Sequence, residues 1–153
     1  MMTDKQPSTG YVIWRLATKW RTAVDRAVKD LGLTHATYSV VTSLLGMERQ
    51  GRHPTQRELA DHTGLEPVYI SRLVTGLEAT GMLSRQQHPE DSRAVVLSLT
   101  ADGEATAKAA ISLVHPLLDD LMAPLGGTDG ERGRHLKQEL LLLLDWQKGP
   151  SQT

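Results

Sequence analysis

The stretch that decides the fold runs from Thr55 to Leu83 and reads TQRELADHTGLEPVYISRLVTGLEATGML. Thr55 followed three residues later by Glu58 forms a capping box, which predicts a helix that begins at Gln56. Ala60, Gly64 and Ile70 then follow at the spacing of a helix-turn-helix. The small residue lets two helices approach, the glycine accepts left-handed backbone in a tight turn, and the aliphatic residue fills the angle between the helices. An ordinary helical hairpin within a core is the alternative, because such patterns are short.

Two short strands are expected directly after this stretch, over residues 83–88 and 94–99. The second alternates, with Val95, Leu97 and Leu99 on one face and Val96 and Ser98 on the other. The polar segment 89–93 between them is short enough only for a hairpin turn. The sequence therefore predicts a winged helix-turn-helix within a mainly α protein that has a small β-hairpin wing, an α+β fold.

Four motifs carry a resemblance to a known family: Thr55-Gln56-x-x-Leu59-Ala60, Gly81-Met82-Leu83, Asp91-x-Arg93 and Leu97-x-Leu99-Thr100-x-x-Gly103. Over residues 34–103 the chain resembles the MarR family of bacterial winged helix-turn-helix transcriptional regulators. The resemblance implies a homodimer that binds double-stranded DNA at a pseudo-palindromic operator. It also implies a DNA-binding lobe over residues 34–100, with residues 1–33 and 101–153 forming the dimerisation region.

The composition limits the classes of protein to consider. The chain has 153 residues, which suits one domain, and no cysteine. The lack of cysteine excludes thiolate metal sites and the cysteine-based peroxide sensing that some relatives use. No apolar run approaches the ~20 residues of a membrane span, and the first residues have no signal-peptide core. We therefore expect a cytoplasmic protein that is not attached to a membrane and needs no metal or cofactor.

The charge balance does not favour DNA binding. The net charge is −1, and between Arg52 and Arg93 five Arg or Lys residues face six Asp or Glu residues. Because neutralisation of phosphates drives nonspecific binding, we expect modest nonspecific affinity. DNA binding then requires that the arginines lie at the surface while the acids face elsewhere.

The second helix of the motif, expected from Pro67 to Thr80, is the recognition helix, and its first turn accepts proline. Its outward face offers the candidate DNA contacts Val68, Tyr69, Ser71, Arg72 and Thr75. Arg72 can form a bidentate contact with guanine in the major groove, as the resemblance also implies, or can contact phosphate alone. Tyr69 can touch thymine methyls or sugars, or can pack on the wing. Val68 stands where many relatives have proline, and Pro67 comes one residue early.

The wing is the second candidate reader of DNA. Arg93 in the hairpin turn can enter a narrow minor groove, and Asp91 can orient it through a charge-assisted hydrogen bond. A salt bridge at the rim with no role in DNA binding is the alternative. Weaker candidates for phosphate contact are Arg85, His88, Thr55, Gln56 and Arg57, the last three at a helix N-terminus.

The flanking segments predict further helices. A first helix covers about residues 10–31, and Thr34 caps a second. Thr100 caps a long helix that reaches Met122, with apolar rows through Ala105, Ala109 and Leu113 and through Ala110, Val114 and Leu118, and with a kink or split at Pro116. A second capping box at residues 128–131 opens a last helix. Apolar residues of the first and last helices are assigned to the dimer interface: Ile13, Leu16, Leu136, Leu140, Leu143 and Leu144.

A ligand pocket can form where the first two helices meet the long helix. Its candidate residues are Trp14, Arg15, Trp20, His35 and Tyr38. In the family, small aromatic acids bind between the dimerisation region and the DNA-binding lobe, so an arginine would pair with the carboxylate of such a ligand. The ligand would favour a spacing of recognition helices that misses the grooves. Each residue can equally be an ordinary core or surface residue.

Other functional classes find less support. The sequence has no HExxH, phosphate-loop or GxSxG motif, and its six histidines are scattered without ligand spacing, so an enzyme or a metal sensor is not favoured. The function predicted is a dimeric, sequence-specific DNA-binding transcriptional regulator that acts as a repressor. The alternative is a winged-helix protein-interaction module that does not bind DNA specifically.

Overall fold

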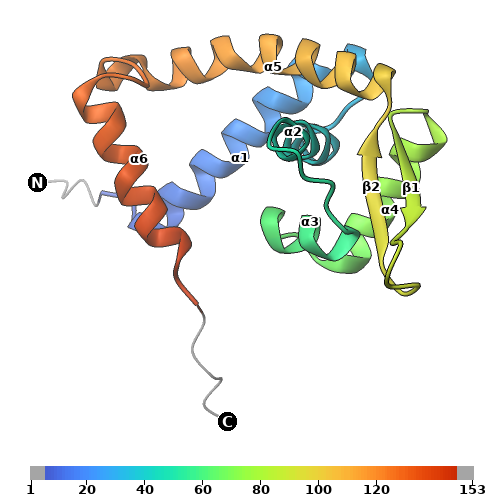
Figure 1. Ribbon diagram of the computed structural model, residues 1–153. Helices are drawn as coiled ribbons and strands as arrows, with labels where there is room; N and C mark the ends of the chain where they lie inside the picture. Colours follow the sequence, from blue (N-terminus) through green and yellow to red (C-terminus); the bar gives the residue numbers. More distant parts are fainter. Residues whose placement is uncertain (1–5, 148–153) are drawn as a thin grey trace, which may run out of the picture. The chain divides into compact units, whose positions relative to one another are not determined.

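The computed structural model of the chain describes residues 6–147 and confirms a mainly helical protein with a two-stranded wing (Figure 1). Its elements are α1 (Thr9–Val28), η1 (Lys29–Leu31), α2 (His35–Arg49), α3 (Gln56–Thr63), α4 (Pro67–Ala79), β1 (Leu83–Gln87), β2 (Val95–Leu99), α5 (Ala101–Met122), η2 (Ala123–Leu125) and α6 (Glu131–Leu144). The chain forms two compact units, residues 1–114 and 115–153, whose boundary lies inside α5. No helix in the described range is long and apolar enough to cross a bilayer.

The first unit has a core that is entirely aliphatic in its fully buried positions. Val24 and Val28 of α1 contribute to it, together with the buried face of α2 and the facing residues Leu59 and Ile70 of the helix-turn-helix. No polar or charged residue is buried among the residues described. The second half of α1 therefore packs into the same core as the helix-turn-helix.

Caps and turns place the helices where the sequence predicts them. Thr34 caps α2 in a capping box with Thr37. Thr55 accepts a hydrogen bond from the N–H of Glu58 at 3.1 Å, so α3 begins at Gln56. Gly64 ends α3 with a φ of 71°, the left-handed backbone that the tight turn requires. Pro67 then occupies the first turn of α4, which fixes the start of the recognition helix.

The wing is an antiparallel hairpin joined to the core through its second strand. Its register runs from Leu83 opposite Leu99 to Gln87 opposite Val95. The N–H of Leu97 donates to the carbonyl of Pro54 at 2.9 Å, and the N–H of Leu99 donates to the carboxylate of Glu48 on α2 at 2.8 Å. As predicted, the face of β2 with Leu97 packs against the core. β2 is therefore fixed both to α2 and to the segment that enters α3.

The beginning of α5 packs closely on the backbone that follows α4. Thr100 accepts a hydrogen bond from the N–H of Gly103 at 3.0 Å and so caps the helix as predicted. A Cβ at Gly103 would lie 1.7 Å from the carbonyl oxygen of Met82, so only glycine fits there. The residues of α5 that are buried in this unit form one row of small side chains: Gly103, Ala107, Ala110 and Val114.

The structure distinguishes between the alternatives predicted for α5. Of the two predicted apolar rows, the one through Ala110 and Val114 is buried at those positions, whereas Ala105, Ala109 and Leu113 are exposed. Of the kink or split predicted at Pro116, the split is wrong, because Pro116 lies inside one continuous α-helix.

In the second unit the predicted capping box at Thr128 is wrong. The N-cap of α6 is Gly130, and no side chain caps it. A Cβ at Gly133 would lie 2.2 Å from the carbonyl oxygen of Gly127, so the preceding loop lies directly against the first turn of α6. This packing moves the start of the helix past Thr128, whose hydroxyl is buried and has no hydrogen-bond partner in the described chain.

Candidate nucleic-acid interface

The recognition helix presents one polar and one apolar face, as its sequence predicts. Ile70, Val74 and Leu77 are buried. On the opposite side Val68 is 68% exposed and Tyr69 39% exposed. The remaining outward candidates are Arg72 and Thr75, which are exposed, and Ser71, which is half-buried. A helix with its N-terminal side chains exposed in this way can enter a groove of DNA.

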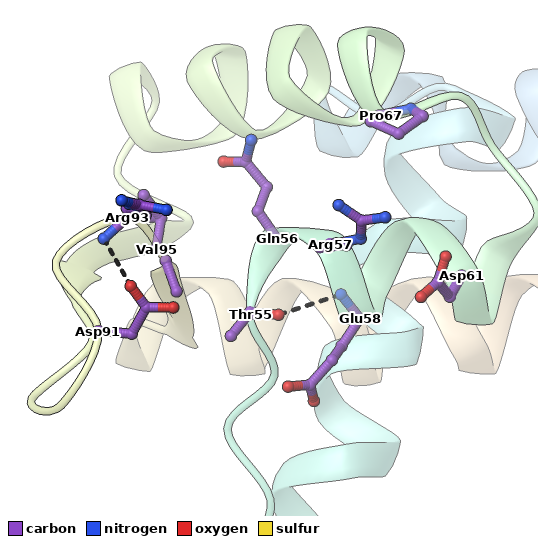
Figure 2. Close-up of a pocket in the computed structure, with 10 residues that line it drawn as sticks. Thr55, Gln56, Arg57, Glu58, Asp61, Pro67, Asp91, Arg93 and Val95 are labelled. Carbon is purple, nitrogen blue, oxygen red and sulfur yellow. Dashed lines mark hydrogen bonds between the residues drawn. The ribbon is translucent and has the colours of Figure 1, made fainter.

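A groove of about 610 Å³ lies between the wing, the start of α3 and the start of α4 (Figure 2). The structure brings five of the residues assigned to DNA binding to this groove, namely Thr55, Gln56, Arg57, Asp91 and Arg93. Arg57 is exposed, and its position in the first turn of α3 places it beside the free N–H groups of that helix. The groove therefore offers the cationic and N–H donors that bind phosphate.

The expectation that acids would face elsewhere is wrong in part. Glu58, Asp61 and Asp91 line the same groove as Arg57 and Arg93. Figure 2 shows the carboxylate of Glu58 on the side of α3 away from the amide of Gln56. The other two acids stay at the groove and lower its positive potential.

The role of Asp91 differs from the predicted one. Its carboxylate accepts a hydrogen bond from the main-chain N–H of Arg93 at 3.0 Å, so it shapes the turn and does not bind the guanidinium (Figure 2). His88 also serves the turn, because its Nδ1 accepts hydrogen bonds from the N–H groups of Glu90 at 3.1 Å and Asp91 at 3.2 Å. Both residues hold the backbone from which Arg93 projects.

The side-chain oxygen of Gln56 is shielded from solvent and has no donor within the described chain. Figure 2 shows the amide directed from α3 towards α4. An unpaired buried acceptor costs about 1–3 kcal/mol. A ligand that donates a hydrogen bond to this oxygen would remove that cost.

The predicted ligand residues do not all come together. Trp20 and His35 line a cavity of about 460 Å³, and Arg21 and Tyr69, which were not predicted to line it, do so too. Trp14, which is 60% exposed, and Arg15, which is also exposed, do not line this cavity. The partly buried Tyr38 packs against the core.

The cavity also differs from its predicted place. Its walls come from α1, α2 and the helix-turn-helix, and none of its lining residues belongs to α5. Burial lowers the pKa of His35, opposed by the nearby charge of Asp25 and assisted by that of Arg21. An uncharged imidazole beside an arginine can accept a hydrogen bond from a ligand while the arginine supplies the charge.

The residues assigned to a dimer interface are apolar, and all of them except Leu136 are exposed. In the first unit Ile13 is 55% exposed and Leu16 44% exposed. In the second unit Leu140, Leu143 and Leu144 are between 49% and 78% exposed, and Leu136 is half-buried. Exposed apolar groups of this size are typical of surfaces that bind a partner.

Comparison with known proteins identifies the family. Residues 31–94 match the sequence model of the MarR family. The chain is 32% identical over 110 residues to the HTH-type transcriptional regulator YdcH of Bacillus subtilis, which covers 72% of this chain and 75% of that protein. The chain belongs to the MarR family. Another relative of this MarR-family chain, the HTH-type transcriptional repressor Rv2887 of Mycobacterium tuberculosis, is 30% identical over 74% of this chain and 78% of its own length.

Solved structures show the same MarR fold. MepR of S. aureus, solved as a complex with DNA, has a TM-score of 0.81 at 19% identity and covers 91% of this chain and 98% of its own. The transcriptional regulator PA3341 has a TM-score of 0.70 at 30% identity, over 90% of this chain and 95% of that one. The winged helix-turn-helix predicted from the sequence is thus confirmed both by the structure of the chain and by these relatives.

Proposed function

We propose that this MarR-family chain is a homodimeric, sequence-specific DNA-binding transcriptional repressor. The observation that carries the proposal is that Pro67 at the start of α4 and the arginine of the wing, Arg93, border one groove with the N-terminus of α3 (Figure 2). The helix that starts at Pro67 would read the major groove, Arg93 would read the minor groove, and the N-terminus of α3 would bind a phosphate. A relative solved with DNA, MepR, supports the same use of the fold.

In this proposal α4 enters the major groove and Arg72 forms hydrogen bonds with a guanine. The outward face of α4 offers little other charge, so Arg72 supplies most of its power to discriminate bases. Val68, which is exposed at the tip of the helix, can contact a thymine methyl group. Arg93 enters the minor groove, where the narrow geometry of A·T-rich sequence concentrates negative potential.

The proposal is tested by selecting bound duplexes from random DNA and then measuring affinity across a salt series. Arg72→Ala should weaken binding to the selected site by about 1–3 kcal/mol and relax the base preference at one position of each half-site. Arg93→Ala should weaken binding to A·T-rich flanks most. Arg26→Ala, which removes an exposed arginine of α1, is the matched control and should leave both properties unchanged. Equal binding of all duplexes by the parent protein would instead support the protein-interaction alternative.

The homodimer is proposed from the uncovered apolar residues of α1 and α6. A single subunit leaves the run Leu140–Leu144 exposed, and a second copy of the same chain can cover it with an equivalent surface. In this proposal residues 1–33 and 101–153 form the dimerisation region and residues 34–100 the DNA-binding lobe. Sedimentation equilibrium should show a dimer, and Leu140→Lys with Leu144→Lys should shift it to monomer; an unshifted dimer would exclude α6 from the interface.

A ligand that releases the DNA is a second element of the proposal, and the cavity beside α4 is the observation that favours it. Tyr69 lines this cavity and also belongs to the recognition helix. A small aromatic or anionic ligand that contacts Arg21 and Trp20 would therefore touch the helix that reads DNA. Such a ligand shifts the equilibrium by as much as it prefers one position of α4 over another.

Fluorescence of Trp20 can test the ligand site. In a background with Trp14→Phe and Trp146→Phe, aromatic acids should quench Trp20 and release DNA over the same concentration range. Arg21→Gln should abolish both effects, whereas Arg15→Gln, which changes an arginine outside the cavity, should abolish neither. If no acid in a broad panel quenches Trp20, the cavity is not a ligand site.

A further inference from the structure

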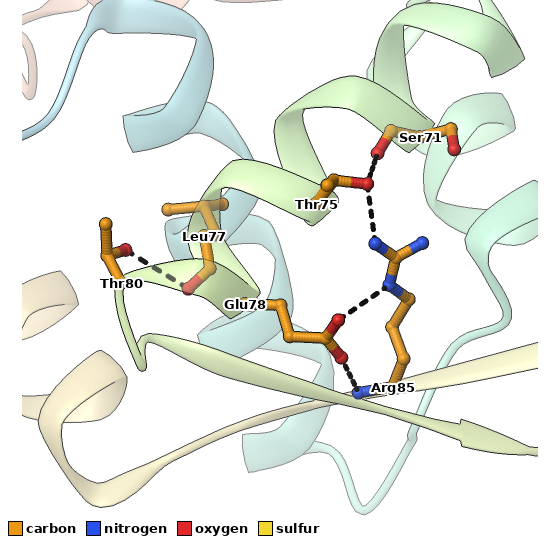
Figure 3. A network of polar contacts seen from close by, with 6 residues as sticks. All are labelled: Ser71, Thr75, Leu77, Glu78, Thr80 and Arg85. Atoms are coloured by element: carbon orange, nitrogen blue, oxygen red, sulfur yellow. Dashed lines mark hydrogen bonds and ion pairs between the residues drawn. The ribbon is translucent and has the colours of Figure 1, made fainter.

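A polar network centred on Arg85 joins the recognition helix to the first strand of the wing (Figure 3). One carboxylate, that of Glu78 on α4, contacts Arg85 twice. It accepts the main-chain N–H of Arg85 at 3.2 Å, and its other oxygen lies 3.5 Å from Nε of the same residue. The guanidinium also donates from Nη2 to the hydroxyl of Thr75 at 2.5 Å, and that hydroxyl donates to the carbonyl of Ser71 at 2.8 Å.

We infer that Arg85 and Glu78 are positioning residues that hold the wing at a fixed angle to the recognition helix, so that Arg93 and Arg72 meet their grooves together. The inference rests on the proposed function and concerns residues that do not themselves read the DNA. It replaces the expectation that Arg85 contacts a phosphate and that Thr75 contacts a base.

The contacts of Arg85 oppose a role in phosphate binding. Its side chain is only 25% exposed, and two of its nitrogen atoms already face protein acceptors. The carboxylate of Glu78 balances its charge, and a phosphate would have to compete with that carboxylate for the same donors. The hydroxyl of Thr75 is occupied as well, because its single proton goes to the carbonyl of Ser71 and one of its acceptor positions goes to Arg85.

The location of the network explains what it can control. Arg85 lies in the middle of β1, which leads into the turn that carries Arg93. Thr75 and Glu78 lie in the part of α4 that follows Arg72. A connection at this point orders the wing before DNA arrives, which removes part of the ordering cost that binding would otherwise include. Without it, each groove contact has to be formed by a wing and a helix that move more independently.

The experiment is a double-mutant cycle on the operator selected with the parent protein. The loss of affinity caused by Arg93→Ala is measured in the parent, in Glu78→Gln and in Thr75→Val. If the network positions the wing, this loss should be smaller in both variants by about threefold or more, because the wing then contributes less to binding. Glu104→Gln, which breaks an exposed ion pair with Lys108 on α5, is the matched control and should leave the loss at its parental value.

Arg85→Lys separates positioning from charge. Lysine keeps the positive charge but cannot present two donors in the geometry of a guanidinium, so positioning predicts weakened binding, by roughly threefold to tenfold. Parental affinity in Arg85→Lys would indicate a simple phosphate contact and overturn the inference. Circular dichroism and thermal unfolding of each variant establish that it is folded at the temperature of the assay.

The remaining outcomes also decide the question. An unchanged cost of Arg93→Ala in Glu78→Gln and Thr75→Val, accompanied only by lower thermal stability, would show that the network is merely structural. A parent protein that binds no sequence selectively would remove the proposed function, and this inference with it. Selective binding by the parent with no effect of the network variants would remove the inference alone.

Discussion

Replacing Gly103 by alanine tests how closely α5 packs on the chain that follows α4. The added Cβ would lie 1.7 Å from the carbonyl oxygen of Met82 and 2.7 Å from its carbonyl carbon. This carbonyl cannot turn aside freely, because it accepts a hydrogen bond from the N–H of Thr100 at 3.0 Å. The helix and the Met82 backbone must therefore separate by more than about 1 Å, since real Cβ atoms rarely come within 3.0 Å of another heavy atom.

The expected loss of stability follows from three contributions. Forcing an extra methyl group into a packed site costs about 1–3 kcal/mol. Loss of the hydrogen bond between Thr100 and Met82 adds about 1 kcal/mol. Alanine is the better helix former and returns up to about 1 kcal/mol. The net loss is therefore about 1–4 kcal/mol, which for a chain of this size lowers Tm by roughly 2–16 °C.

The assay is urea unfolding followed by circular dichroism at one fixed subunit concentration, because self-association would otherwise change the apparent stability. Gly46→Ala is the matched control. Gly46 lies in α2 with an exposed site and no atom within 4 Å of an added Cβ, so alanine should stabilise the protein there by about 0.5–1 kcal/mol. If Gly103→Ala is as stable as Gly46→Ala, α5 does not approach Met82 as described.

Three further changes test other features of the fold. Thr55→Ala should lower the free energy of unfolding by about 1 kcal/mol through loss of the cap on α3, and an unchanged urea midpoint would contradict that role. Gly64→Ala should cost about 1–2 kcal/mol because its φ of 71° strains any side chain, whatever the space around it; a gain in stability would refute the left-handed turn. Burial lowers the pKa of His35 below its ordinary value of 6.5, so the unfolded chain binds the proton more readily. The contribution of the neutral His35 to the free energy of unfolding should therefore be fully present above pH 6.5 and decline as the pH falls towards the lowered pKa. His35→Gln should make the decline of stability with falling pH less steep.

The features predicted correctly from the sequence are those that depend on near neighbours in the chain. A hydroxyl caps the N–H three residues ahead, and Thr34 and Thr55 do so in the structure. The turn at Gly64 and the inward face of α4 follow from backbone geometry and helical spacing alone. The same applies to β2, where alternation gives the face on which Leu97 is buried.

The features that could not be predicted depend on contacts between distant segments. The buried row of α5 begins with Gly103, because the helix lies there against the carbonyl of Met82 and leaves no space for a side chain. Apolar spacing alone predicted two rows, and it did not distinguish the row with Leu113, which is exposed, from the row with Ala110 and Val114, which are buried. The start of α6 was misplaced for the same kind of reason, since Gly133 lies against the carbonyl of Gly127 and this contact overrides the local capping pattern at Thr128.

For the candidate site, the residue types were predictable but several of their partners were not. Asp91 and Arg93 lie two residues apart in the turn. At that spacing the carboxylate can accept from either the main-chain N–H or the guanidinium of Arg93, and in the structure it accepts from the N–H.

One error in the predicted ligand site was avoidable. Arg15 lies about 140° from Trp20 around a helix of 3.6 residues per turn, so the two could not line one cavity together. Arg21, which does line it, is nearer to the face of Trp20.

The two strands of the wing are fastened to different parts of the lobe. The main chain of β1 is bonded to Glu78 of α4, whereas that of β2 is bonded to Glu48 of α2 and to Pro54 just before α3. Any rotation of the recognition helix relative to α2 must consequently appear as sliding between the strands. The paired residues from Leu83 to Gln87 oppose that sliding. The stiffness of the short pairing between β1 and β2 thus limits how far the recognition helix α4 can rotate relative to α2.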